Sequence, residues 1–229
     1  MKSAFRLMIC ALLALTCVPA MSQETGTLIK HKAAQANGRS DPNTARQFTE
    51  QFAACVLSRN PGRTTKIIGM RADTPEYRSY LTSLYDFVDE CNGDADVEFS
   101  PVLFRGNLFQ AFYAKEFKTS GPMTFDPALD SGYAKLYGET PSAEAIQSIA
   151  LERFGECVAR ADATNVRALL RAPTGLGAES AAFAALAPRF SGCLTAGQKF
   201  TFSKAMIKGV LAEGLYRLSV AATRGAHAG

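Results

Sequence analysis

The sequence contains few of the residues on which metal binding and catalysis usually depend. Among 229 residues it has only two histidines, His31 and His227, and both lie near an end of the chain. A catalytic histidine is therefore not expected, and a zinc site is weakly supported because no Cys-x-x-Cys pair occurs. The chain also lacks a Gly-x-Ser-x-Gly elbow, a Walker loop and a dinucleotide-binding glycine motif. We predict no catalytic residue, no cofactor and no metal ligand set.

Long apolar runs and strong charge are also missing. The most compact apolar run, residues 7–15, is too short to span a bilayer, which takes about 20 residues. No later segment is apolar enough to cross a membrane. The formal net charge is only +4, and basic residues do not cluster with aromatic ones, so nucleic-acid binding is not expected. An apolar share of 47% and a charged share of 20% are typical of a folded globular protein.

The start of the chain has the pattern of an export signal. Lys2 and Arg6 give a basic beginning, residues 7–15 form the apolar run, and residues 18–20 offer the small side chains at which a signal peptidase cuts. We therefore expect the protein to be periplasmic or secreted. Two alternatives stay open, a retained membrane anchor and a lipid attached to Cys17, although the residues before Cys17 are not the small ones that usually precede a lipidated cysteine.

Four cysteines remain after the signal, in two pairs with the same spacing. Cys55 and Cys91 lie 36 positions apart, as do Cys157 and Cys193, and the second pair follows the first by 102 positions. Four cysteines allow three pairings. A unit that folded before it was duplicated should carry its own bridge, so we predict the disulfides Cys55–Cys91 and Cys157–Cys193. Such bridges are typical of an oxidising compartment.

The sequence around the cysteines repeats as well. The segment that begins at Phe52 resembles the segment that begins at Phe154, and residues 105–113 resemble residues 208–216 after a shift of one position. The chain is therefore interpreted as a duplicated unit. We predict a signal peptide at 1–20, a flexible leader at 21–40, a first repeat at 41–118, a linker at 119–140, a second repeat at 141–222 and a tail at 223–229.

The apolar spacing within each repeat is helical. Phe48, Phe52 and Val56 fall on one stripe of a first helix, which Asp41 and Pro42 are suited to begin. A short second helix follows, then a third with one apolar face from position 77 to position 91, then a fourth with a serine at its start. No strand alternation of useful length occurs. The predicted fold is all-α, a tandem duplication of a roughly four-helix unit in which one disulfide pins each unit.

The fourth helix of each repeat is apolar on nearly every side, which indicates that it is buried at the centre of its unit. Gly106 and Gly209 stand at equivalent positions inside it. A glycine there costs about 1 kcal/mol relative to alanine, so its presence in both copies predicts that another backbone approaches closely.

Polar side chains interrupt this helix at equivalent positions in the two repeats. One interpretation is internal, because a buried polar group needs hydrogen-bonding partners. The other is a cleft, present twice, for a small polar ligand. The residues are Arg105, Gln110 and Tyr113 in the first repeat and Lys208, Glu213 and Tyr216 in the second.

The first repeat is also more aromatic than the second. Tyr77, Tyr80 and Tyr85 correspond to a glutamate and two alanines in the second repeat. If the linker covers these tyrosines, they belong to the core. If it does not, they form a partner-binding face, since aromatic residues are enriched at interfaces.

Acidic residues crowd around the second cysteine of the first repeat. A pair of carboxylates can cleave a glycosidic bond without histidine, and alternating acids can bind calcium, although the EF-hand spacing is absent. A solvated acidic loop is the simplest interpretation. These acids are Asp86, Asp89, Glu90, Asp94, Asp96 and Glu98.

No single pattern in the sequence determines the function. The hypothesis that the sequence favours is an exported, non-enzymatic helical protein that binds a partner protein or a small polar ligand. The alternative is a carboxylate-dependent hydrolase of cell-wall glycan that uses the acids of the first repeat.

Overall fold

The computed structural model describes residues 28–31, 41–85, 88–92, 95–98, 100–117, 120–138, 141–194 and 203–226. The predicted signal peptide, with Cys17, lies outside these ranges. So do most of the predicted leader and the last three residues of the predicted tail. Within the described ranges no helix is long and apolar enough to cross a membrane.

The fold is a helical duplication, as predicted. In the first repeat the helices are α1 (Pro42–Arg59), α2 (Pro61–Ile68), α3 (Pro75–Tyr85), the short α4 (Asp89–Asn92) and α5 (Pro101–Glu116). In the second they are α6 (Ala143–Ala161), α7 (Ala163–Arg171), α8 (Gly177–Cys193) and α9 (Lys204–Ala226), and the linker between the repeats contains the 3-10 turn η1 (Ala134–Leu136).

A short β-ribbon was not predicted. Strand β1 (Leu28–His31) pairs antiparallel with β2 (Ala95–Glu98), and Leu28 lies opposite Glu98. Part of the leader that we expected to be flexible is therefore paired with the segment before α5. Each strand has only four residues, too few for an alternating pattern to stand out in the sequence.

Both predicted disulfides are formed. Cys55 at the end of α1 bonds to Cys91 in α4, with their Cα atoms 5.8 Å apart. Cys157 in α6 bonds to Cys193 at the end of α8, with a Cα separation of 5.6 Å. The two bridges occupy equivalent places, which confirms that each repeat carries its own.

The third helix differs between the repeats. We expected one helix to carry both Tyr77 and Cys91, but α3 ends at Tyr85 and Cys91 lies in the separate α4. The backbone N–H of Val88 donates to Tyr85 and that of Cys91 to Val88, so tight i+3 turns replace the i+4 bonds of a continuing helix. In the second repeat α8 runs unbroken to Cys193.

Local capping residues explain where several helices begin. The carboxylate of Asp41 accepts a hydrogen bond from the backbone N–H of Thr44 at 3.0 Å, and Pro42 occupies the first turn of α1. The hydroxyl of Ser203 accepts from the N–H of Met206 at 3.2 Å, at the start of α9. Ser100 stands at the N-cap of α5 as predicted, but its side chain makes no capping bond.

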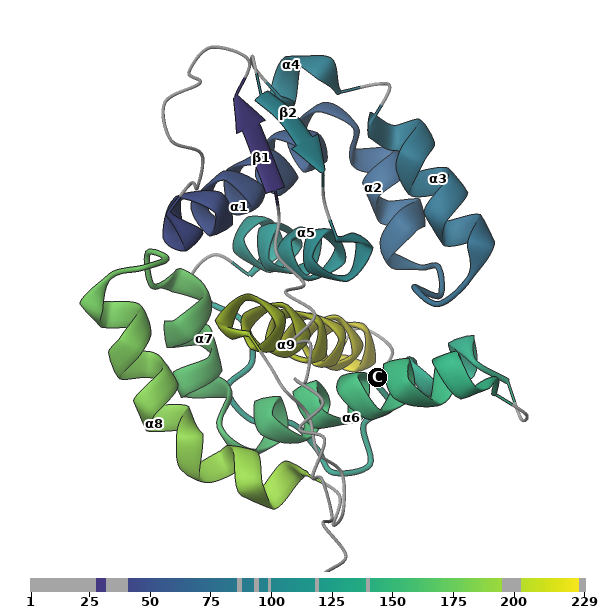
Figure 1. The fold of residues 1–229 in the computed structure, drawn as a ribbon. Helices are drawn as coiled ribbons and strands as arrows, with labels where there is room; N and C mark the ends of the chain where they lie inside the picture. The colour runs from purple at the N-terminus through teal and green to yellow at the C-terminus, as the bar shows by residue number, and fades with distance from the viewer. Residues whose placement is uncertain are drawn as a thin grey trace, which may run out of the picture.

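Helices α5 and α9 cross at the centre of the molecule, between α1–α3 on one side and α6–α8 on the other (Figure 1). A Cβ atom built on Gly106 would lie 2.5 Å from the Cα of Gly209, and one built on Gly209 would lie 2.9 Å from the Cα of Gly106. The predicted close backbone approach is confirmed, and each glycine is the partner of the other. The fourth helix therefore packs on its counterpart as well as on the helices of its own repeat.

The two repeats share one hydrophobic core. Phe104 and Leu108 of α5 and Leu211 and Leu215 of α9 are completely buried in the same cluster. Outer helices of both repeats contribute to that cluster, for example through Val56 of α1.

Candidate functional site

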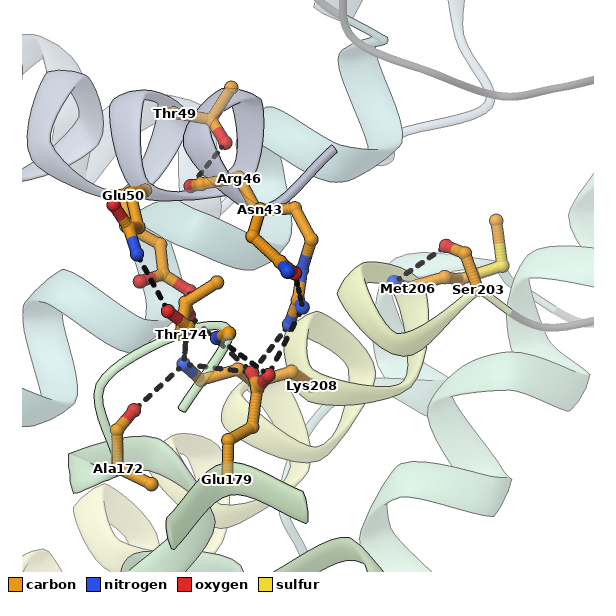
Figure 2. Close-up of polar contacts among 12 residues, drawn as sticks. Asn43, Arg46, Thr49, Glu50, Ala172, Thr174, Glu179, Ser203, Met206 and Lys208 are labelled. Carbon is orange, nitrogen blue, oxygen red and sulfur yellow. Dashed lines mark hydrogen bonds and ion pairs between the residues drawn. The ribbon is translucent and has the colours of Figure 1, made fainter. Parts of the chain in front are cut away.

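Lys208 of α9 lies at the centre of a buried polar cluster between the repeats (Figure 2). Its side chain is only 2% exposed. The Nζ atom donates to Glu50 of α1 and to the hydroxyl of Thr174, both at 2.9 Å, and to the carbonyl of Ala172 at 3.3 Å. A carboxylate oxygen of Glu179 lies 3.7 Å away. A lysine of the second repeat is thus held partly by a carboxylate of the first.

Glu179 extends this cluster to a second cation. The guanidinium of Arg46 in α1 makes a bidentate pair with its carboxylate, and the backbone N–H of Gly175 donates to it at 3.0 Å. Burial opposes ionisation of Glu179, but the hydrogen bonds from Arg46 and Gly175 and the nearby charges outweigh it, so the pKa lies below its ordinary value. Two cations and two carboxylates therefore balance across the interface between the repeats.

Arg105 of α5 lies in a second buried cluster of charged residues. It binds Glu213 of α9 through two N–H groups, at 2.9 and 3.2 Å. Arg217 donates to the same carboxylate at 2.9 Å. Burial opposes ionisation of Glu213, yet the charges of both arginines outweigh it and hold the pKa below its ordinary value.

Arg105 and Lys208 also bind carbonyl groups at the ends of other helices. Arg105 donates to the carbonyl oxygens of Ile67, Ile68 and Met70 at the end of α2. Lys208 donates to the carbonyl of Ala172 at the end of α7. The last carbonyls of a helix have no partner within it and carry partial negative charge, so a cation is favoured there. This equivalent geometry explains why both repeats carry a basic residue at this position.

Glu50 and Glu152 are an equivalent pair that our sequence interpretation missed. They stand 102 positions apart, the offset that relates the two repeats. Glu50 binds Lys208, whereas Glu152 of α6 accepts a hydrogen bond from the hydroxyl of Tyr137 in the linker at 2.9 Å. Both positions hold glutamate at the offset that relates the repeats, and this match in the sequence could have revealed the pair.

The remaining candidate residues of the fourth helices also contact the protein itself. The hydroxyl of Tyr113 accepts from Arg167 of α7 at 2.7 Å. The hydroxyl of Tyr216 donates to Glu116 at 3.0 Å. Gln110 is partly exposed, and its buried amide oxygen has no hydrogen-bond partner among the described residues. Arg105, Tyr113, Lys208 and Glu213 are buried, so they do not line an open cleft.

The three tyrosines of α3 have different surroundings. Tyr77 is completely buried and donates to the carbonyl of Pro101 at 3.1 Å. Tyr85 packs among the rings of Phe52 and Phe104. Tyr80 lies at a shallow surface groove, beneath the ammonium group of Lys66, which is 4.7 Å from the centre of its ring.

This groove lies between α2 and α3 and is open to solvent. Its volume is about 500 Å³, and most of its lining surface is apolar. We call it the α2–α3 groove. It is lined by Lys66, Met70, Pro75, Glu76, Ser79, Tyr80 and Ser83.

The equivalent face of the second repeat lacks these side chains. At the repeat offset, every residue of the α2–α3 groove is replaced by an alanine or a glycine. Because α7 and α8 form the same pair of helices without these side chains, the fold does not require them. The equivalent residues are Ala168, Ala172, Gly177, Ala178, Ala181, Ala182 and Ala185.

The acids near Cys91 are described only in part. Glu90 forms an exposed ion pair with Arg59 at 3.2 Å. Asp86 and Asp94 lie outside the described residues, and the side chains of Asp89, Asp96 and Glu98 are not described. In the described part of the chain, no group of three or more histidine, cysteine or acidic residues is placed to hold a metal ion.

Comparisons of the chain with protein-family models, with curated proteins and with solved structures give no match.

Proposed function

We propose that this is an exported, non-enzymatic protein that binds a polypeptide partner through the α2–α3 groove of its first repeat. The difference between the repeats carries this proposal. Duplication placed the same helix pair on both copies, and one copy presents charged, hydroxyl and aromatic side chains where the other presents only alanine and glycine.

Two observations support export. The beginning of the chain has the composition of a signal peptide. Both cysteine pairs form disulfides, which persist in oxidising compartments and are rare in the cytosol.

The shape of the groove favours a polypeptide over a small ligand. Small-molecule sites are enclosed and bury most of the ligand surface. The α2–α3 groove is open, so a ligand of that size would stay largely in water. A segment of a partner protein extends beyond the groove and is held by further contacts along its length, as is usual at protein interfaces.

The lining residues favour a partner segment of a particular chemistry. Met70, Pro75 and Tyr80 offer an apolar floor for an aliphatic or aromatic side chain. Lys66 forms no ion pair with a described carboxylate and lies directly over Tyr80. A segment with an apolar side chain next to an aspartate or glutamate would fill the floor and pair with Lys66.

The experiment uses the disulfide-bonded full chain as bait in periplasmic extract, beside the double variant Lys66→Ala/Tyr80→Ala. These substitutions install the residues of the second repeat. We expect the wild type to retain a partner and the variant to bind the purified partner at least about tenfold more weakly, since a few residues carry most of the binding energy of an interface and tyrosine is common among them.

A control variant separates groove binding from general surface effects. Arg78→Ala/Thr82→Ala changes exposed residues of α3 that do not line the groove, and it should bind as the wild type does. Equal binding by the groove variant would contradict the proposal. So would an equal loss in the control.

A further inference from the structure

Among the described residues, the buried carboxyl group of Glu152 binds no cation directly, unlike that of its counterpart Glu50. Glu50 binds the ammonium group of Lys208 directly. Glu152 is only 7% exposed, accepts a bond from Tyr137 on one oxygen, and has no hydrogen-bond partner for the other oxygen among the described residues. The duplication has therefore left one carboxyl group of an equivalent pair incompletely satisfied.

The charged and titratable groups around Glu152 come from α5, α9 and the linker, which contributes Tyr133 as well as Tyr137. Arg105 of α5 and Arg217 of α9 attract its ionised form, while Glu213 of α9 repels it. Tyr137 comes from the linker and is itself buried, and the guanidinium of Arg71 lies 5.0 Å from the centre of the Tyr137 ring.

The balance of these effects disfavours the ionised state. Burial, followed by the charge of Glu213, raises the pKa of Glu152 to about 7, against the opposing effects of the two arginines and the Tyr137 hydroxyl. A carboxyl group with a pKa near neutrality changes its charge under ordinary conditions.

Among the described residues, the segment that covers Glu152 contacts α6 through Ser131, Tyr137 and Tyr133, which forms a hydrogen bond with Arg153. Ser131 donates to Glu156 at 2.6 Å, and Tyr137 donates to Glu152 one turn earlier on the same helix face. Tyr137 is the side chain of residues 131–138 that binds the carboxyl group of Glu152 itself. We call these residues the strap.

We propose that the strap is a pH-dependent cover, closed over Glu152 when its carboxyl group is protonated and opened more often when that group is ionised. An ionised carboxylate needs donors for both oxygens. One oxygen has none among the described residues, and water reaches it when Tyr137 moves away.

The direction of the effect follows from the proton balance. Opening the strap hydrates the carboxyl group and removes part of the burial that raises its pKa, so Glu152 titrates at a lower pH with the strap open than with it closed. The opening equilibrium constant should therefore be lowest at acidic pH, rise with pH by less than about tenfold per pH unit, and level off above the pKa of the closed form, about 7.

Hydrogen–deuterium exchange of the disulfide-bonded full chain tests this proposal. We expect protection of the amides of residues 131–138, corrected for intrinsic exchange rates, to fall by about threefold or more between pH 5.5 and 7.5. The amides of residues 211–219 in the core of α9 should show no such change. An unchanged protection of the strap would overturn the proposal.

Two matched variants identify the group responsible. Glu152→Gln keeps the size and the acceptor for Tyr137 but cannot ionise, so its strap should show pH-independent protection. Glu50→Gln alters the equivalent carboxyl group, which binds Lys208 and not Tyr137, and should keep the wild-type pH profile. A wild-type profile in Glu152→Gln would assign the effect to another group and refute the proposal. If Glu152→Gln does not fold, the wild-type profile alone still decides whether the strap responds to pH.

Discussion

At the scale of single residues, each fourth-helix cation has two roles. Lys208 and Arg105 lie at the end of the second helix of their own repeat, and each binds a carboxylate of the other repeat. Removing one member of a buried pair leaves the other charge without compensation, which is usually much more destabilising than the loss of a surface pair. The clusters are therefore expected to contribute strongly to the cohesion of the two repeats.

The substitution Lys208→Met tests this role. It keeps the apolar stem but removes the charge that Glu50 and Glu179 share, so we expect the free energy of unfolding to fall by about 3 kcal/mol. Urea titration followed by circular dichroism measures this change. Lys135→Met, which removes a lysine from an exposed ion pair with Asp130, should change stability little. Similar losses in the two variants would contradict a special role for Lys208.

The Arg46–Glu179 pair makes a prediction about pH. Because its folded-state pKa is lowered, Glu179 stabilises the protein above pH 4.5, its ordinary pKa, and this contribution disappears as the pH falls through the lowered value. The stability difference between the wild type and Glu179→Gln should be large at pH 7 and shrink below about pH 4. Unfolding curves across this range measure it. If the stability difference between the wild type and Glu179→Gln grew on acidification, folding would raise the pKa of Glu179 and the account would be wrong.

At the scale of elements, the crossing of α5 and α9 depends on the absence of side chains. The Cβ of an alanine at position 106 or 209 would lie within 3 Å of the opposing backbone. Such a contact forces the two helices apart, and overpacking of this kind costs about 1 to 3 kcal/mol. This cost opposes the better helix propensity of alanine, which is worth about 1 kcal/mol.

We therefore expect Gly106→Ala and Gly209→Ala each to lower the midpoint of urea unfolding. Gly62→Ala is the matched control, because nothing lies within 4 Å of a Cβ at position 62 in α2. It should be neutral or slightly stabilising. If Gly106→Ala and Gly209→Ala had the same midpoint of urea unfolding as Gly62→Ala, the crossing of α5 and α9 would not be tightly packed.

Most of the helices could be predicted because their signals are local and occur twice. The apolar stripes and the Asp-Pro start predicted the helices. The equivalent cysteines predicted the disulfides, and the paired glycines predicted the close approach of two backbones. The pairing of β1 with β2 depends on a partner more than 60 positions away, and strands of four residues carry almost no pattern of their own. The end of α3 before Cys91 has no proline or glycine to mark it.

The candidate site was less predictable than the fold. Tyr77, Tyr80 and Tyr85 lie on one predicted helix, but how deeply each is buried depends on which helices pack against it. Sequence periodicity cannot separate Tyr77, which is buried, from Tyr80, which lines the α2–α3 groove. The replacement of the groove residues by alanine and glycine was visible in the sequence, but only the structure shows that these positions lie together.

At the scale of the whole molecule, two disulfide-bonded repeats are joined through one core. Side chains of α1, α5, α6 and α9 belong to the same buried cluster. Charge pairs and the glycine crossing connect the repeats at the centre of that cluster. Because the described residues of both repeats belong to this one cluster, the two repeats are expected to unfold together.

The most direct test of this shared core is calorimetry of the wild type and of the variant Cys157→Ser/Cys193→Ser. Opening a 36-residue loop in the second repeat should lower stability by about 4 kcal/mol in the chain-entropy description. A shared core predicts one transition in both proteins, shifted to lower temperature in the variant. Two separate transitions in the variant, with the first repeat melting at the wild-type temperature, would show that each repeat folds on its own core.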